Sequence, residues 1–309
     1  MSTSTVEMVF SSFDELINAI LPNGSIGQRI DGYIFRGEGS GKFKLLPSAL
    51  RKENFERLRA QMGNHIYKLN DTEWLQVFTE YQILRNFYIT ANNSGLKVHA
   101  TERMAKHYFD VVSPEFVLNG EPVVWIDAEL VELAALAQHY GALTRMIDWS
   151  KDLLVALYFA CVGAMKRYIN GEYDDMVIWA LDASGIQVNE QHIYTMGKET
   201  CPLKLVVPSY YSNANLKAQK GVLSYWKILA RREDKKVVDR TPLDELIQTI
   251  PKIGCDRQVL YKFILPNKCA LDAYKWLKNM GVGAAAIFPG YRGVVLQMKE
   301  NALLENAMK

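Results

Sequence analysis

The sequence has 309 residues and little cysteine, and its four cysteines lie far apart. They are Cys161, Cys201, Cys255 and Cys269, and no two of them form a C-x-x-C pair. This spacing argues against a disulfide framework and against a cysteine-based zinc site. We therefore expect a protein of a reducing cytoplasm whose chemistry needs no metal ion.

A hydrophobic run long enough to cross a membrane is also missing. The longest apolar segment, residues 153–165, has about 13 residues, whereas a helix that crosses a bilayer needs about 20. We expect this segment to be a buried core helix. The first residues carry no basic region followed by an apolar core, so they do not resemble a secretory signal. No membrane partner is expected.

Neither charge sign is in clear excess, because 36 lysine and arginine residues oppose 34 acidic residues and give a net charge of +2. This balance excludes a broad polybasic surface as the main source of affinity, although it is compatible with a local basic groove. The chain also lacks internal repeats and low-complexity linkers. We therefore expect a single domain over residues 1–309.

The hydrophobic periodicity alternates between that of helices and that of strands, which predicts an α+β fold. Residues 1–31 are expected to hold one helix and a loop, because Ser12 and Glu15 have the spacing of a capping box. A short strand at 33–36 follows, and residues 47–125 are expected to form a mainly helical insertion. The other expected elements are helices at 128–140, 152–168 and 271–280, a helix that begins near 241, a strand or turn at 143–148, and strands at 175–181, 205–207, 222–223, 259–265 and 284–288.

The polar strip at residues 138–150 is wedged between two apolar segments. It contains His139, Thr144, Arg145, Asp148 and Trp149. A buried polar group without a partner costs about 1–3 kcal/mol, so these side chains must either bond to one another or contact a ligand. The strip therefore predicts a structural network or a binding site.

A second polar cluster follows the apolar residues Tyr33 to Phe35. It begins with Arg36, and glycines occupy positions 37, 39 and 41. Glycines allow backbone N–H groups to approach a phosphate closely. A glycine-rich segment after a strand is also typical of an ordinary turn, so both interpretations stay open at this point.

Five short motifs occur along the chain in a fixed order. They are Phe35-Arg36-Gly37, residues 44–48 with Arg51, residues 138–150, residues 218–222 and residues 287–290. In this order they resemble the FRG domain family of bacterial proteins, over about residues 32–296. FRG proteins in turn resemble distant members of the ADP-ribosyltransferase fold. The resemblance implies an ADP-ribosyltransferase-like mixed β core with a helical insertion after the first strand, and NAD as the substrate.

The resemblance also implies roles for particular residues. Those expected to bind NAD are Arg36, Gly37, Glu38, His139, Thr144 and Arg145, and those expected to act in catalysis are Arg36, His139 and Gln219. A guanidinium group clamps a pyrophosphate in two places at once, which an ammonium group does not. In the alternative interpretation, Arg145 and Asp148 form an internal ion pair, His139 caps a helix and Trp149 belongs to the core.

Gln219 departs from the pattern of most ADP-ribosyltransferases, which have a glutamate at this place. An amide binds a ribose hydroxyl, but it does not act as a base. The departure leaves three possibilities: Glu38 supplies the carboxylate, the acceptor is activated in another way, or the activity is weak.

The expected reaction is transfer of ADP-ribose from NAD to a macromolecule. Lysines and aromatic residues alternate at 210–211, 217–220, 225–227 and 274–278, which slightly favours RNA over protein as the acceptor. These aromatics are equally compatible with the core faces of strands and helices. The resemblance further implies a toxin or antiphage effector held by an antitoxin protein. A non-enzymatic nucleotide or nucleic-acid binding module is the alternative, and NAD hydrolysis without transfer is a third possibility.

Overall fold

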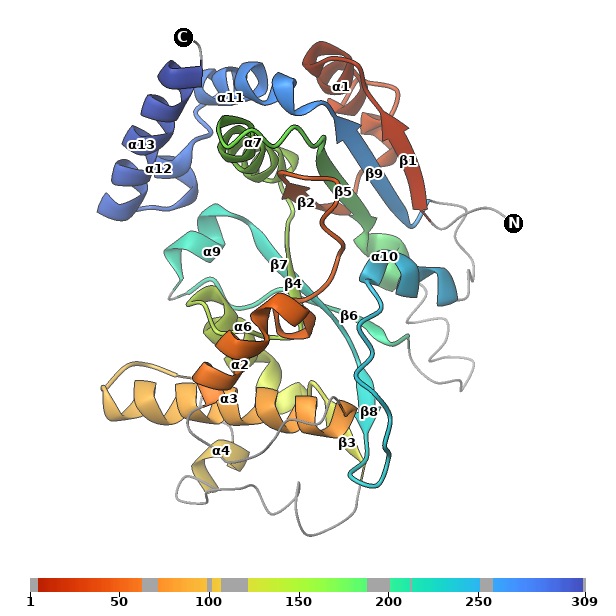
Figure 1. Ribbon diagram of the computed structural model, residues 1–309, viewed down its shortest axis with the longest axis vertical. Coiled ribbons are helices and arrows are strands. Elements are labelled where there is room, and N and C mark those ends of the chain that lie inside the picture. Colours follow the sequence, from red (N-terminus) through yellow and green to blue (C-terminus); the bar gives the residue numbers. More distant parts are fainter. Residues whose placement is uncertain are drawn as a thin grey trace.

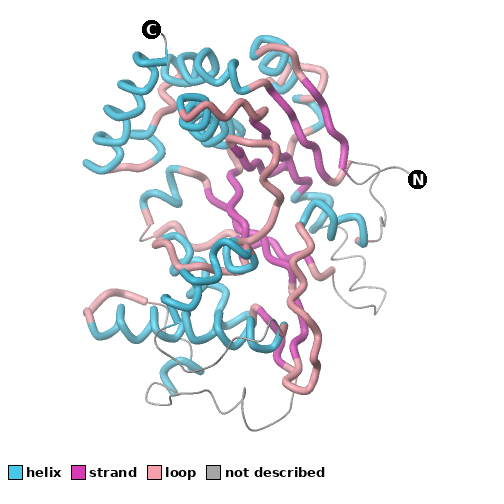
Figure 2. The backbone as a smooth tube through the Cα atoms, viewed as in Figure 1, coloured by secondary structure: helices cyan, strands magenta, loops and turns pink. Residues whose placement is uncertain are grey.

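The computed structural model describes residues 5–62, 72–98, 102–106, 122–187, 201–211, 213–250 and 258–307. A mixed sheet of seven strands, in the order β1-β9-β5-β2-β4-β7-β6, lies at the centre of this α+β fold (Figures 1 and 2). Only β1 and β9 are parallel, and every other neighbouring pair is antiparallel. The strands are β1 (Thr5–Val9), β2 (Tyr33–Glu38), β4 (Met146–Ser150), β5 (Met176–Asp182), β6 (Leu203–Val206), β7 (Gly221–Trp226) and β9 (Leu260–Leu265).

The sheet is almost divided between β2 and β4. β2 pairs with β5 over its whole length, from Tyr33 opposite Asp182 to Glu38 opposite Val177. Its pairing with β4 is limited to Phe35 opposite Ser150. The backbones of the remaining residues of β2 and β4 therefore do not pair, and side chains of both strands border a cavity.

One face of the sheet is covered by helices α1 (Phe13–Ile20), α7 (Leu153–Ile169) and α11 (Ala270–Asn279), with α12 (Ala284–Ile287) and α13 (Tyr291–Ala307) beside them (Figure 1). Helix α7 is buried along most of its length and packs closely against β2. The buried carboxylate of Glu300 in α13 accepts hydrogen bonds from the hydroxyls of Tyr158 and Tyr274, at 2.6 and 2.7 Å. These bonds connect α13 to α7 and α11.

A second hydrophobic cluster lies at the other end of the molecule, around the long helix α3 (Glu73–Asn93). It includes α6 (Val131–His139) and the small antiparallel pair β3 (Val123–Trp125) and β8 (Ile228–Ala230). Strands β4 and β7 reach from the main sheet into this cluster (Figure 1). The remaining helices are α2 (Phe55–Met62), α4 (Glu102–Lys106), α9 (Ala214–Ala218) and α10 (Leu243–Leu246).

Most of the expected elements are confirmed, including the capped first helix, in which Ser12 Oγ accepts from the backbone N–H of Glu15. The strand expected at 284–288 is wrong, because this short apolar run forms helix α12. Periodicity alone does not distinguish a strand from a buried helical turn in such a run. The strands β1, β3 and β8 and the helix α13 were not predicted. Among the described residues, no helix has both the length and the apolar composition needed to cross a membrane.

Candidate functional site

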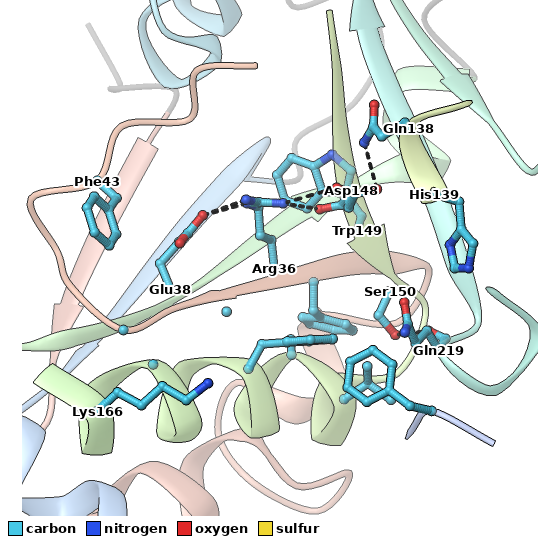
Figure 3. Close-up of a pocket in the computed structure, with 18 of the residues that line it drawn as sticks. Arg36, Glu38, Phe43, Gln138, His139, Asp148, Trp149, Ser150, Lys166 and Gln219 are labelled. Carbon is cyan, nitrogen blue, oxygen red and sulfur yellow. Dashed lines mark hydrogen bonds and ion pairs between the residues drawn. The ribbon is translucent and has the colours of Figure 1, made fainter. Parts of the chain in front are cut away.

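A cavity of about 650 Å³ lies where β2 and β4 part. We call it the Arg36 cavity (Figure 3). Its walls come from β2, from the end of α6, from β4, from one side of α7 and from two later segments. The residues from these segments include Arg36, Glu38, His139, Asp148, Phe159, Lys166, Gln219 and Phe288. Segments that are far apart in the sequence thus meet at one place.

Arg36 lies in the middle of this cavity and is partly exposed. Its Nε and Nη2 atoms contact Glu38 Oε1 at 2.8 and 2.6 Å, and its Nη1 atom donates to the backbone oxygen of Asp148 at 2.9 Å. Burial opposes the charge of the guanidinium group, but Glu38 and Asp148 outweigh this effect and raise its pKa. These contacts leave further N–H donors of Arg36 available to a ligand.

A row of hydrogen bonds within residues 138–148 supports Arg36. Gln138 Nε2 donates to Asp148 Oδ1 at 2.7 Å, and the hydroxyl of Thr144 donates to Gln138 Oε1. Asp148 in turn holds Arg36 through its backbone oxygen. The polar strip is therefore in part a structural network whose end reaches the cavity.

His139 is the last residue of α6 and its half-buried ring borders the cavity (Figure 3). The ring forms no hydrogen bond with the residues that the structure describes, so His139 does not cap the helix through its side chain. Burial lowers the pKa of His139 below its usual value, and the nearby Asp148 carboxylate offsets only part of this shift. The imidazole is therefore neutral at pH 7 and can accept a proton.

Gln219 reaches the same cavity from the turn between α9 and β7. Its side-chain Nε2 donates to the backbone oxygen of Ile287 at 3.4 Å, and its backbone oxygen accepts from Ser150 Oγ at 2.7 Å. The bond from Ser150 ties this turn to the end of β4. The fold thus places Gln219 at the same cavity as Arg36 and His139.

Residues 31–168 match the family model described as the FRG domain. The chain contains an FRG domain. The match includes Arg36, residues 44–51 and the polar strip, but it ends well before the residue 296 expected from the sequence. Gln219 and Phe288 lie outside the matched range and still border the cavity. No curated protein and no solved structure matches the chain. An ADP-ribosyltransferase-like architecture therefore remains a prediction.

Two of the residues expected to bind NAD do not border the Arg36 cavity. Arg145 is 3% exposed and pairs with Glu73 at 2.7 Å and with Glu80 at 3.1 Å. Its predicted partner, Asp148, is exposed and contacts Arg36 and Gln138 instead. Thr144 is also buried and serves the hydrogen-bond row. Both residues build the FRG domain and have no access to a ligand in the cavity.

Trp149 belongs to the core, as the alternative interpretation held. The side chain is 3% exposed, and its Nε1 donates to Ser224 Oγ at 2.8 Å. Trp149 also borders the Arg36 cavity, but its buried ring belongs to the core cluster of the sheet.

The glycines after Arg36 serve packing, and their approach to a phosphate stays a prediction, because Gly37 and Gly39 also border the cavity. A Cβ atom on Gly37 would lie 1.8 Å from the backbone oxygen of Ala156 in α7, and one on Gly39 would lie 2.3 Å from the backbone of Gly163. The N–H of Gly41 already donates to the backbone oxygen of Asp175 at 2.7 Å. Glycine is needed here because strand and helix backbones touch.

Several residues that border the cavity were not predicted as site residues. Phe159 and Phe288 form an edge-to-face pair with ring centroids 6.1 Å apart. Lys166 is exposed and has no ionic or hydrogen-bond partner in the described part of the chain. Phe159, Gly163 and Lys166 recur at helical spacing along α7, so a stripe of this helix faces the cavity. We had expected the same helix to be buried on all sides.

Some rings of the aromatic and basic segments lie in the core. Tyr225 is 8% exposed and packs in the cluster around α3, and Tyr274 is fully buried against Glu300. The hydroxyl of Tyr210 donates to the backbone oxygen of Gly221. Tyr211, in contrast, is 84% exposed, so the preference for RNA as the acceptor stays a prediction.

Proposed function

We propose that the protein is a mono-ADP-ribosyltransferase that binds NAD in the Arg36 cavity and transfers ADP-ribose to a macromolecular acceptor. The observation that carries this proposal is the meeting of Arg36, Glu38, His139 and Gln219 in one cavity of about 650 Å³. That volume lies within the range of about 300–1,000 Å³ that is usual for small-molecule sites.

The chemistry of the cavity walls suits a dinucleotide. Arg36 and the unpaired Lys166 supply positive charge for a pyrophosphate. Phe43 borders the cavity (Figure 3), and so does the pair of Phe159 and Phe288, so aromatic surface is available for planar rings. The carboxylate of Glu38 lies beside Arg36, which supports the possibility that Glu38 replaces the glutamate missing at position 219.

In this reaction the bond between the nicotinamide nitrogen and the ribose carbon breaks, and its electron pair leaves with nicotinamide. An oxygen or nitrogen of the acceptor forms the new bond to that carbon and gives up its proton. Neutral His139 or the Glu38 carboxylate receives the proton, because both border the cavity. Negative charge from Glu38 and Asp148 favours the positive charge that develops on the ribose. The Gln219 amide is assigned to a ribose hydroxyl.

Replacement of Arg36 tests the proposal. We expect Arg36→Ala to lower NAD turnover by about 10- to 100-fold or more, because it removes a charge-assisted contact to the pyrophosphate. Arg36→Lys should restore little of the loss, since an ammonium group lacks the planar fork. Release of nicotinamide from NAD is the measurement, and the intact mass of RNA and protein fractions then distinguishes transfer from hydrolysis.

Arg59→Ala is the matched control for this experiment, because Arg59 is an exposed arginine that pairs with Glu56 and does not border the Arg36 cavity. Its turnover should equal that of the wild type. A folded Arg36→Ala variant that consumes NAD at the wild-type rate contradicts the assignment of the cavity.

An enzyme of this kind damages its own cell unless it is restrained. We therefore propose a toxin or antiphage effector that acts in the cytoplasm and is held by an antitoxin protein. RNA and protein are both retained as acceptors, because Tyr225 and Tyr274 are buried in the core whereas Tyr211 is exposed.

The second candidate is a non-enzymatic nucleotide or nucleic-acid binding module. Two observations favour it: position 219 holds an amide, and Arg36 is already engaged by Glu38. In this case the wild-type protein binds NAD or a related nucleotide without releasing nicotinamide, and Arg36→Ala weakens binding alone.

A further inference from the structure

A second cavity, of about 400 Å³, lies next to the first. Arg36, Gln138 and Asp148 border both, so the hydrogen-bonded row that they form lies between the two cavities. The far side of the second cavity is made by residues 45–57, and we call it the Arg51 cavity. Residues of the motif at 44–48 and Arg51 border this cavity, and they do not border the proposed NAD site.

The guanidinium group of Arg51 is held in place but is not neutralised. Arg51 is half-buried, and its Nε donates to the backbone oxygen of Leu46 at 2.9 Å. Its two Nη groups have no partner among the residues that the structure describes. A guanidinium that is fixed at one edge and open at the other is prepared to bind an anion at low cost in side-chain entropy.

The other charged groups of the Arg51 cavity leave it positive. Arg57 borders it and, within the described ranges of the chain, bonds only to the neutral side chain of Asn54, at 3.3 Å. The carboxylates at its border are Glu53, which is exposed, and Asp148, which already serves Arg36 and Gln138. Two uncompensated arginines therefore face one free carboxylate, and the cavity attracts negative charge.

The walls of the Arg51 cavity also define the size and polarity of its ligand. Leu46 and Pro47 give it an apolar side, and Ser48 and Asn54 add neutral polar groups. An apolar surface beside a guanidinium pair suits a nucleoside that carries a phosphate, because the arginines bind the phosphate oxygens in two places and the apolar side covers the sugar and base.

We propose that the Arg51 cavity binds the phosphate group of a nucleotide, either free or at the end of a single strand, with Arg51 and Arg57 as its anchors. The hydrogen-bonded row of Arg36, Gln138 and Asp148 separates the Arg51 cavity from the Arg36 cavity. We therefore assign the Arg51 cavity to the acceptor of ADP-ribose, a role that rests on the proposed NAD chemistry. Binding of the phosphate itself does not depend on that chemistry.

Calorimetric titration of the full chain tests this proposal with adenosine monophosphate, adenosine, and a short single-stranded RNA with or without a 5′-phosphate. We expect the ligands that carry a phosphate to bind and those that lack it to bind at least about tenfold more weakly. Binding of the monophosphate alone identifies a free nucleotide as the ligand, and binding of the phosphorylated strand as well identifies a strand end.

The variants separate this cavity from its neighbour. Arg51→Ala and Arg57→Ala should each weaken binding of the monophosphate by about tenfold, and the exposed position of Arg57 makes its variant safe for folding. Arg59→Ala, on the same helix as Arg57, should leave this binding unchanged, because Arg59 borders neither of the two cavities.

Equal binding of adenosine and its monophosphate overturns the proposal, and so does wild-type affinity in both arginine variants. Equal binding of a phosphopeptide overturns the assignment to a nucleotide. Failure of NAD turnover with intact phosphate binding contradicts the proposed function and leaves the Arg51 cavity as an anion site.

Discussion

Arg36 and Arg145 are both ion-paired, yet they have opposite roles in the molecule. Arg36 is one-fifth exposed and borders two cavities, whereas Arg145 is sealed between two carboxylates of α3. Glu80 also accepts hydrogen bonds from Trp125 and Gln76, so the buried charges are well compensated. A buried ion pair contributes little when it is complete, but removal of one partner leaves an isolated charge.

We expect Arg145→Met to lower the free energy of unfolding by about 3–5 kcal/mol, because the variant buries two carboxylates without their cation. Urea denaturation followed by circular dichroism measures this effect. Arg145→Lys keeps the charge and should lose less. If the variant unfolds at the same urea concentration as the wild type but no longer consumes NAD, Arg145 contributes to NAD binding and is not mainly structural.

At the scale of elements, the close contact between β2 and α7 explains why a glycine follows Arg36. The strand lies so close to the helix that a Cβ atom on Gly37 would overlap the backbone oxygen of Ala156. Because both partners are backbone, no side-chain rotation relieves the overlap. The position of Arg36 over the cavity therefore depends on this contact.

Gly37→Ala should destabilise the protein by about 3 kcal/mol or more, since the strand or the helix has to move. Gly41→Ala is the matched control, because an added Cβ there meets Val177 at 3.3 Å and its backbone conformation is compatible with alanine. The melting temperatures of the two variants provide the measurement. Equal melting temperatures would show that α7 yields easily and that the close packing is unimportant.

At the scale of the whole molecule, the hydrophobic clusters share strands. In β4, Met146 packs in the cluster around α3, whereas Ile147 and Trp149 pack in the cluster beneath the main sheet. In β7, Tyr225 packs in the cluster around α3, and Val222 packs in the cluster beneath the main sheet. Because β4 and β7 contribute side chains to both clusters, neither cluster can unfold completely unless these strands also detach from the other cluster.

We therefore expect α3 and β5 to open in one cooperative step, although they lie in different clusters. Hydrogen exchange measured by mass spectrometry should give peptides from the two elements the same opening free energy in their slowest amides. A markedly lower opening free energy for α3 would show that the helical part unfolds by itself and that residues 1–309 do not act as a single domain.

Local patterns were sufficient for most of the fold. Ser12 with Glu15 marked α1, the apolar run at 153–165 marked α7, and the apolar stretches at 175–181 and 259–265 marked β5 and β9. Such signals are local, because a cap or a periodic face depends on residues within a few turns. The short segments β3, β8 and α12 were missed or misassigned because tertiary contacts stabilise them and their own pattern is weak.

The sequence by itself determined the alternation of helices and strands, the polar strip at 138–150 and the family resemblance that singled out Arg36, His139 and Gln219. Only the tertiary structure decided which polar groups face a ligand. Arg145 and Asp148 are close neighbours in the sequence, but Glu73 and Glu80, which lie more than 60 residues earlier, draw Arg145 into the core. The partner of a buried charge is set by elements that are distant in the chain, and no local pattern records that choice.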